Sequence, residues 1–234
     1  MTKANVLDLY HGDNRDAVPD FAALKANGIF AIIHKVSQGT KFVDPQYASR
    51  KKAALAAGLL WGGYHFLTSA DPIEQAKFFL ENTEADANTL LAADFEKSAA
   101  TPALHQLQDF VSYVDQNSPG NVMCVIYSSD LIRETLKPHQ GGHRATTMNG
   151  AEIFFAQHRL WLAEYGPHAN VPWPWSDKSM SQMWATPFLW QYSETGRVNP
   201  VVGNVDLNYY PGTANELAAN WPNLQSVTKN PAVV

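Results

Sequence analysis

The chain has 234 residues, of which 45% are hydrophobic and 17% charged, a balance typical of a well-buried globular protein rather than a disordered one. A net charge of −5 argues against a nucleic-acid-binding protein, for which a basic stripe is expected. No stretch approaches the roughly 18 apolar residues of a membrane span. The single cysteine, Cys124, excludes an internal disulfide framework and lies in an apolar run typical of a buried thiol.

Short apolar runs alternate with helix-like segments along the chain. We predict eight strands, at residues 5–10, 29–36, 59–67, 89–96, 121–129, 160–165, 188–193 and 204–210. Helices are predicted between the early strands, at residues 18–28, 44–58, 71–83 and 101–117. Two of them begin at Asp-Pro pairs, in which Asp44 and Asp71 are the expected N-caps.

This alternation over roughly 200 residues implies an α/β fold with a parallel sheet, most simply a TIM-like (β/α) barrel of one domain. Residues 137–150 form a polar loop, and helices become sparse after residue 165, so the second half is expected to be irregular. We assign residues 1–222 to the barrel and 223–234 to a loose C-terminal tail. The basic run Arg50-Lys51-Lys52 is interpreted as the solvated face of a helix.

Acidic residues fall at predicted strand ends. Asp94 and Glu96 are two residues apart, so in a strand they share one face, about 6–7 Å apart along the chain. Asp8 lies near the end of the first strand and Asp206 within or near the end of the last, and these strands are neighbours in a barrel. Any one of these acids could be a helix cap or an exposed loop residue. Four on one rim are hard to explain as stabilisation, because clustered carboxylates repel one another.

Aromatic and amide side chains occur at the same strand ends, as in a sugar-binding groove. The residues that we assign to substrate binding on this basis are Tyr64, His65, Tyr127, Trp161, Gln191 and Tyr192. Three more tryptophans, Trp173, Trp175 and Trp184, lie in or near a loop, and Trp190 is interpreted as core. About half of these aromatics could be plain core residues.

A metal site is the weaker interpretation of the histidines. Asp8, His11, His34 and His65 could be assembled into one, but the sequence has no His-x-His pair, no H-E-x-x-H and no cysteine ligand set. It also has no glycine-rich phosphate loop and no Gly-x-Ser-x-Gly elbow. We therefore expect no metal and no cofactor.

The segments VLDLYHGDN, GGYHF, AADFE, VIYSS, LWLAEY and WQYSETGRV…GNVDLNYY follow one another over residues 5–212. In this order they resemble glycoside hydrolase family 25, the Chalaropsis-type lysozymes or N-acetylmuramidases. The resemblance implies an irregular β/α barrel and hydrolysis of the β-1,4 bond between N-acetylmuramic acid and N-acetylglucosamine in peptidoglycan. The chain departs from the family pattern at two positions, neither of them one of the four acids. Tyr10 replaces a common serine, and Gln38 replaces a common glutamate in the segment Lys35–Gly39. From the same segment we add Lys35 to the substrate-binding residues.

By this resemblance Glu96 is the general acid, and Asp8, Asp94 and Asp206 are its acidic partners. Asp94 and Asp206 would stabilise positive charge at the anomeric carbon, or one of them would orient the substrate's 2-acetamido group as an internal nucleophile. Retention is expected, but the sequence does not separate this assisted route from a direct enzyme nucleophile. Asp8 is expected to tune a pKa or to hold a tyrosine.

Two other functions stay open at this point. A glycan-binding barrel without turnover would keep the groove, although the intact Glu96 argues against it. A chitinase-like barrel usually shows a longer Asp-x-x-Asp-x-Asp-x-Glu series, and LLAADFE lacks the earlier acids.

The expected partner is a peptidoglycan strand, with neither nucleic acid nor membrane, and the expected state is a monomer. The first residues show no signal-peptide core. We therefore expect action on the wall after release or non-Sec export, as in a phage lysin or a secreted effector, or else a trimmed secreted protein.

Overall fold

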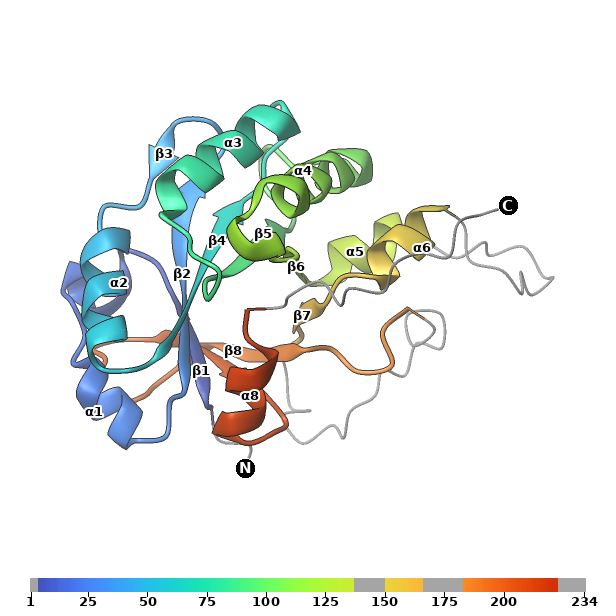
Figure 1. Cartoon of the computed structure of the whole chain (residues 1–234). Coiled ribbons are helices and arrows are strands. Elements are labelled where there is room, and N and C mark those ends of the chain that lie inside the picture. The colour runs from blue at the N-terminus through green and yellow to red at the C-terminus, as the bar shows by residue number, and fades with distance from the viewer. Residues whose placement is uncertain (1–3, 137–149, 166–182, 223–234) are drawn as a thin grey trace.

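Eight strands close into a barrel in the computed structural model, which describes residues 4–136, 150–165 and 183–222 (Figure 1). In ring order they are β1 (Val6–Leu9), β2 (Ala31–Gln38), β4 (Leu60–Phe66), β5 (Leu90–Phe95), β6 (Val125–Ser128), β7 (Leu160–Ala163), β8 (Leu189–Gly196) and β9 (Val205–Tyr209). The pairing of β1 with both β2 and β9 closes the ring, and the short β3 (Phe42–Val43) pairs with β2 outside it. All eight predicted strands and the barrel are confirmed; β3 was not predicted.

The last strand runs against the others. Neighbouring strands from β1 to β8 are parallel, whereas β9 is antiparallel to both β8 and β1. Residues 197–204 form a short connection between β8 and β9. A parallel pair would need a crossover connection of a dozen or more residues, so this connection fits only an antiparallel pair. Asp206 therefore lies near the beginning of its strand rather than near the end. Because the strand is reversed, it still reaches the rim formed by the carboxyl ends of the others.

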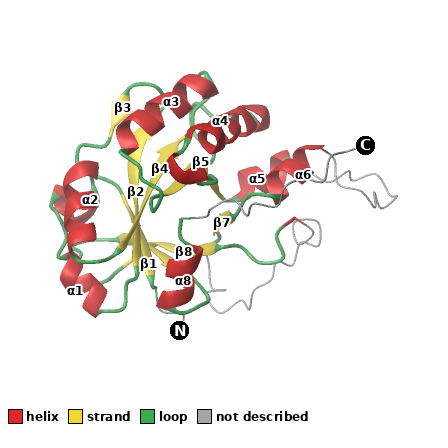
Figure 2. Cartoon of the chain, in the orientation of Figure 1, coloured by secondary structure: helices red, strands yellow, loops and turns green. Residues whose placement is uncertain are grey.

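Helices surround the barrel (Figure 2). Within the described residues they are α1 (Phe21–Ala26), α2 (Tyr47–Ala56), α3 (Pro72–Thr83), α4 (Leu104–Asn117), α5 (Asp130–Thr135), α6 (Gly150–Ala156) and α8 (Ala214–Asn220), with 3-10 turns η1 (Asp13–Asp16) and η2 (Pro119–Asn121). The four predicted helices correspond to α1–α4. Helix α8, which was not predicted, has Leu217 packed with the interior of the barrel, and Trp221 beyond it donates its indole N–H to Trp61 O at 2.9 Å.

One of the two Asp-Pro helix starts is confirmed. Asp71 caps α3, accepting hydrogen bonds from the backbone N–H groups of Ile73 and Glu74, with Pro72 in the first turn. The prediction for Asp44 is wrong, because α2 begins only at Tyr47 and Gln46 is its N-cap. Asp44 is instead buried and ion-paired with His11 at 3.0 Å.

Alternation along the strands divides the apolar side chains into two cores. One fills the barrel, with Val6, Ala31, Ile33, Leu90 and Ala92 among its members. The larger core lies between the sheet and the helices, and there Cys124 is fully buried, as predicted. Strand geometry produces this division, because successive side chains point to opposite faces.

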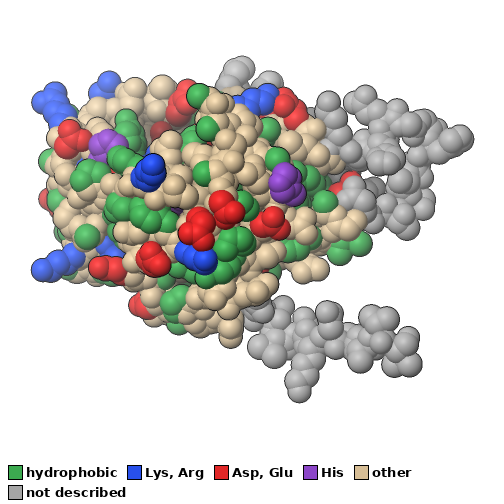
Figure 3. All heavy atoms as spheres, turned by 90° about the horizontal axis from the view of Figure 1, so that it is seen from above, with side chains coloured by type: hydrophobic (Ala, Val, Ile, Leu, Met, Phe, Trp, Pro, Cys, Tyr) green, Lys and Arg blue, Asp and Glu red, His purple; other side chains and the backbone are tan. Residues whose placement is uncertain are grey.

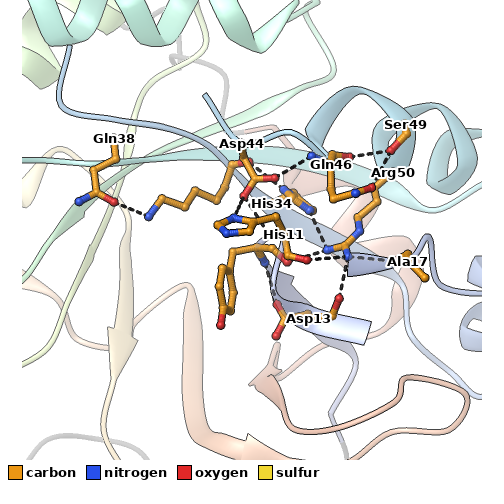
Figure 4. A network of polar contacts seen from close by, with 11 residues as sticks. His11, Asp13, Ala17, His34, Gln38, Asp44, Gln46, Ser49 and Arg50 are labelled. Atoms are coloured by element: carbon orange, nitrogen blue, oxygen red, sulfur yellow. Dashed lines mark hydrogen bonds and ion pairs between the residues drawn. The ribbon is translucent and has the colours of Figure 1, made fainter. Parts of the chain in front are cut away.

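The interpretation of residues 50–52 as a solvated helix face is wrong for Arg50, which is fully buried. Its guanidinium donates hydrogen bonds to backbone carbonyl groups of the segment after β1 (Figure 4). Lys51 is half-buried and donates to Thr83 O at 3.1 Å, and only Lys52 is exposed.

Among the described residues, no helix is both long enough and apolar enough to span a membrane. The predicted tail, residues 223–234, and nearly all of the predicted polar loop, residues 137–149, lie outside the described part of the chain.

Candidate active site

The four predicted acids lie on the carboxyl-end rim of the barrel. Asp8 and Asp206 are directly opposite each other in the β1–β9 pairing. Asp94 is on β5, and Glu96 follows one residue after that strand ends. Asp8 and Asp94 are each only 5% exposed, whereas Glu96 and Asp206 are partly open to solvent. Figure 3 shows acidic side chains gathered around a basic one on one face of the molecule.

Gln191 links the rim across four strands. Its Nε2 donates to Asp8 at 2.8 Å and to Asp206 at 3.4 Å. Its Oε1 accepts a hydrogen bond from the Tyr127 hydroxyl at 2.8 Å and another from the Tyr165 hydroxyl. The side chain is 1% exposed, so this one amide fixes the relative positions of two carboxyl groups and two phenols.

Asp8 and Asp206 are placed to share a proton in a hydrogen bond. Burial raises the pKa of Asp8, against hydrogen bonds from Asn208, Gln191 and Asp206 that lower it. Burial, followed by the charge of Asp8, raises the pKa of Asp206 to about 10. Two adjacent carboxyl groups cannot both ionise in a poorly solvated site. Asp206 therefore keeps its proton at neutral pH and can donate it in a hydrogen bond to Asp8.

Asp94 and Glu96 form the second pair. Burial and then the charge of Glu96 raise the pKa of Asp94 well above its ordinary value. Burial and then the charge of Asp8 raise the pKa of Glu96, and Lys35 acts in the opposite direction. Asp94 Oδ1 is buried and has no hydrogen-bond partner among the described residues. A buried oxygen without a donor is uncommon in folded proteins and is typical of sites that receive a ligand group.

Besides Gln191, three of the predicted substrate-binding residues accompany the acids. Tyr64 on β4 and Tyr127 on β6 point into the barrel, and both flank Trp161, with ring centroids 6.4 and 4.6 Å away. Lys35 on β2 is half-buried, with its Nζ donating to Gln38 Oε1 at 2.7 Å. Burial lowers the pKa of Lys35, whereas Asp94 raises it.

Two predicted substrate-binding residues lie elsewhere. His65 is fully buried outside the barrel, stacked on Phe110 and hydrogen-bonded to Ser37 Oγ at 2.8 Å, and burial lowers its pKa to about 3. Tyr192 likewise packs in the outer core, beside Trp190. The structure therefore does not bring either side chain to the acids. The reason is the strand period of two, since their neighbours Tyr64 and Gln191 point inward.

The tryptophans are structural where they are described. Trp161 lies inside the barrel but is 1% exposed, too deep to stack on a sugar, and donates its N–H to Asn208 Oδ1 at 2.6 Å. Trp184 is buried and donates to His158 O, and Trp190 is buried as predicted. Trp173 and Trp175 lie outside the described residues.

Within the described residues, no group of three His, Cys, Asp or Glu side chains is arranged to hold a metal ion. His11 is paired with Asp44, and His34 is fully buried and stacked on Trp61.

The family model for glycosyl hydrolases family 25 matches residues 7–201, most of the chain and nearly the whole barrel. This chain belongs to glycosyl hydrolases family 25. The match confirms the resemblance inferred from the sequence motifs.

Individual relatives of this family 25 chain are distant. Lysozyme M1 of Streptomyces globisporus is 24% identical over 214 residues, covering 86% of this chain and 66% of that protein. The autolytic lysozyme of Clostridium acetobutylicum is 25% identical over 213 residues, covering 87% of this chain and 55% of that protein. The chain therefore spans just under two thirds of the first relative's length and about half of the second's.

The fold is also that of solved structures. The crystal structure of the bacterial lysozyme from Streptomyces coelicolor matches with a TM-score of 0.72 at 24% identity, covering 96% of this chain and all of that one. At this identity the likeness concerns the fold, and it confirms the barrel of the family 25 domain.

Three residues around the carboxyl cluster were missed by sequence reasoning. Asn208 is fully buried and donates to Asp8 at 2.7 Å. It is two residues after Asp206, so strand alternation alone could have placed it on the same face. Tyr165 is the last residue of one predicted strand and Glu194 comes directly after another, and Glu194 raises the pKa values of both Glu96 and Asp206. Their position gave no signal stronger than that of other polar residues at the end of a strand.

We predict that Gln191→Leu destabilises the domain by about 2 kcal/mol, because it leaves the buried Tyr127 hydroxyl without an acceptor and removes a donor from Asp8. Urea denaturation at neutral pH measures this change. A variant as stable as wild type would show that the amide does not hold the rim together.

Proposed function

We propose that this family 25 hydrolase cleaves the β-1,4 bond between N-acetylmuramic acid and N-acetylglucosamine in peptidoglycan, with Glu96 as general acid. The observation that carries the proposal is the state of Glu96, which is partly exposed at the mouth of a buried carboxyl cluster and has a raised pKa. A general acid must hold its proton at the working pH and must reach the leaving oxygen. Asp206 is also partly exposed and has a raised pKa, but its proton is directed to Asp8, whereas Glu96 occupies the glutamate position of the Asp-x-Glu pattern.

The other acids take electrostatic roles in this proposal. Asp94 is two residues before Glu96 on the chain, and its unpartnered Oδ1 suits the N–H of the substrate's 2-acetamido group. Holding that group in place would favour attack by its carbonyl oxygen and therefore retention at the anomeric carbon. The Asp8–Asp206 pair carries one negative charge beside the developing positive charge. Gln191 and Asn208 are positioning residues that act through Asp8.

The proposal is tested by incubating purified peptidoglycan with the protein and analysing the soluble fragments. The expected products carry new reducing ends on N-acetylmuramic acid. New reducing ends on N-acetylglucosamine would mean that the other glycosidic bond is cut. Binding to the polymer without any release would favour the alternative, a glycan-binding barrel without turnover.

The pH profile gives a sharper test of the two carboxyl roles. Lys35 lowers the pKa of both Asp94 and Glu96. In this proposal Asp94 acts ionised and Glu96 protonated. Activity is then lost on the acid side through whichever of the two has the lower pKa and on the alkaline side through the other. Lys35→Met should raise both pKa values and move both limbs of the profile of kcat/KM to higher pH.

Glu194→Gln is the matched variant of opposite sign. Glu194 raises the pKa of Glu96 and is not among the groups that shift Asp94. We expect only the limb that belongs to Glu96 to move, and to lower pH. A profile in which neither limb moves, or both move equally, would contradict the role of Glu96 as one of the two titrating groups.

A further inference from the structure

A cavity of about 540 Å³ is lined by Asp206 and otherwise by residues that Gln191 does not contact. Residues from two segments form its walls. They are Tyr10, Gly12, Asp13 and Arg15 after β1, and Glu194, Arg197, Val202, Gly203 and Asn204 from the end of β8 to the start of β9. Because Asp206 belongs to both, the cavity is continuous with the candidate active site.

The first wall is held by a buried cation. Arg50 is fully buried, and its guanidinium donates to Tyr10 O at 2.6 Å, to Asp13 O at 2.7 Å and to Ala17 O at 2.8 Å. Asp44 accepts a further hydrogen bond from the His11 backbone N–H at 2.9 Å (Figure 4). The wall is therefore fixed by several contacts from α2 and the segment before it.

The held segment has an unusual backbone. Asn14, Arg15 and Asp16 have φ values of 53, 51 and 59°, in the left-handed region that side chains other than glycine rarely adopt. Asn14 Oδ1 accepts a hydrogen bond from the Val202 N–H at 2.9 Å, which ties the two walls together. Such a conformation persists only where its surroundings impose it, and here it presents Arg15 to the cavity.

The cavity has an aromatic side and a cationic side. Tyr10 is 45% exposed, and its ring lies so close over Gly12 that a Cβ there would meet it at 2.7 Å. Arg15 and Arg197 are both exposed, and within the described residues neither guanidinium has an ion-pair or hydrogen-bond partner. The lining also includes the carboxyl groups of Asp13 and Glu194, and the raised pKa of Asp206 keeps that carboxyl protonated at neutral pH. Two guanidinium groups without a partner of their own suit a carboxylate, whose two oxygens match the guanidinium geometry.

We propose that this cavity binds a carboxylate on the side arm of the N-acetylmuramic acid residue, with Arg15 and Arg197 as the cations and Tyr10 as the apolar wall; the inference rests on the proposed function. N-acetylmuramic acid differs from N-acetylglucosamine by a lactyl ether, which ends in a carboxyl group. In a bare glycan that carboxylate is free. In a complete wall it forms an amide with a stem peptide, which carries carboxylates of its own.

Direct binding tests the proposal without turnover. Three probes are titrated into ¹⁵N-labelled protein: N-acetylmuramic acid, N-acetylmuramyl-L-alanyl-D-isoglutamine and N-acetylglucosamine. Amide signals of residues 202–204 should shift with at least one of the two carboxylate probes. In the double variant Arg15→Ala/Arg197→Ala, the Kd for that probe should rise about tenfold. The control Lys52→Ala removes an exposed cation that does not line the cavity and should leave Kd unchanged.

The titrations distinguish the two possible carboxylates. Weakening for N-acetylmuramic acid assigns the lactyl carboxylate, and weakening for the dipeptide conjugate assigns the stem peptide. The proposal is overturned if neither carboxylate shifts these signals, if the double variant binds as wild type does, or if N-acetylglucosamine binding weakens equally. Failure of the muramidase proposal is seen separately, as the absence of reducing muramic-acid ends from wild-type digests.

Hydrolysis provides the second readout. Peptidoglycan glycan strands are compared before and after their free carboxylates are converted to methylamides. The double variant should raise KM about tenfold on untreated strands with kcat retained, and should match wild type on the amidated strands. An equal rise in KM on both substrates would show that the arginines do not read a carboxylate.

Discussion

Glu96→Gln is expected to lower kcat on peptidoglycan by about 1,000-fold, because the amide cannot protonate the leaving oxygen. The substitution keeps the size and shape of the side chain, which is only partly buried, so the fold should be retained. Removing one of several repelling carboxylates should in addition lower the raised pKa of Asp94. Fragment release measured across the pH range separates this loss from a mere shift of the profile.

Glu74→Gln is the matched control for that experiment. Glu74 is an exposed glutamate on α3, ion-paired with Lys77 at 2.8 Å, and it should leave kcat unchanged. If Glu96→Gln retained the wild-type rate at every pH, another residue would have to be the acid. Loss of rate accompanied by loss of the folded circular dichroism spectrum would instead make Glu96 a structural residue.

The second large effect concerns stability. Arg50→Met should lower the free energy of unfolding by about 3–5 kcal/mol, because it removes a fully buried cation that donates to several partly buried carbonyl groups at once. Arg50→Lys keeps the charge but cannot reach all of these acceptors, so an intermediate loss is expected. Urea denaturation measures both variants.

Lys52, on the same helix, provides the control for Arg50. Lys52→Met removes a cation from an exposed position and should change stability by less than about 0.5 kcal/mol. Equal effects at positions 50 and 52 would contradict the role of Arg50 as the anchor of the segment after β1.

The sequence allowed the barrel and the acid cluster to be predicted for simple reasons. Apolar runs of strand length alternate with helical ones, and only a parallel sheet accommodates that order. Asp94 and Glu96 share a face because of strand periodicity, and Asp8 and Asp206 meet because the first and last strands of a barrel are neighbours. These inferences use only short-range geometry and ring closure.

The predictions were wrong where contacts between residues far apart in the sequence determine the position of a side chain. Periodicity says that only one of two adjacent strand residues faces the barrel, but not which, so the pairs Tyr64–His65 and Gln191–Tyr192 were each half wrong. No local pattern distinguishes Arg50 from Lys52, because the acceptors of Arg50 lie more than 30 residues away in the chain. The cavity depends on the same long-range contacts, and its arginines had not been singled out.

The reversed strand has a consequence for how the protein is made. Asp206 and Asn208 come from β9, which supplies the final pairing of the ring, and their partner Asp8 is about 200 residues earlier. During synthesis the edge of β1 that pairs with β9 stays open until β9 has left the ribosome. The contact that completes the cluster joins residues that are among the farthest apart in the sequence. The carboxyl cluster is therefore assembled only after nearly the whole barrel has emerged, and a nascent chain arrested before residue 205 carries Glu96 but no proton-sharing pair to work beside it.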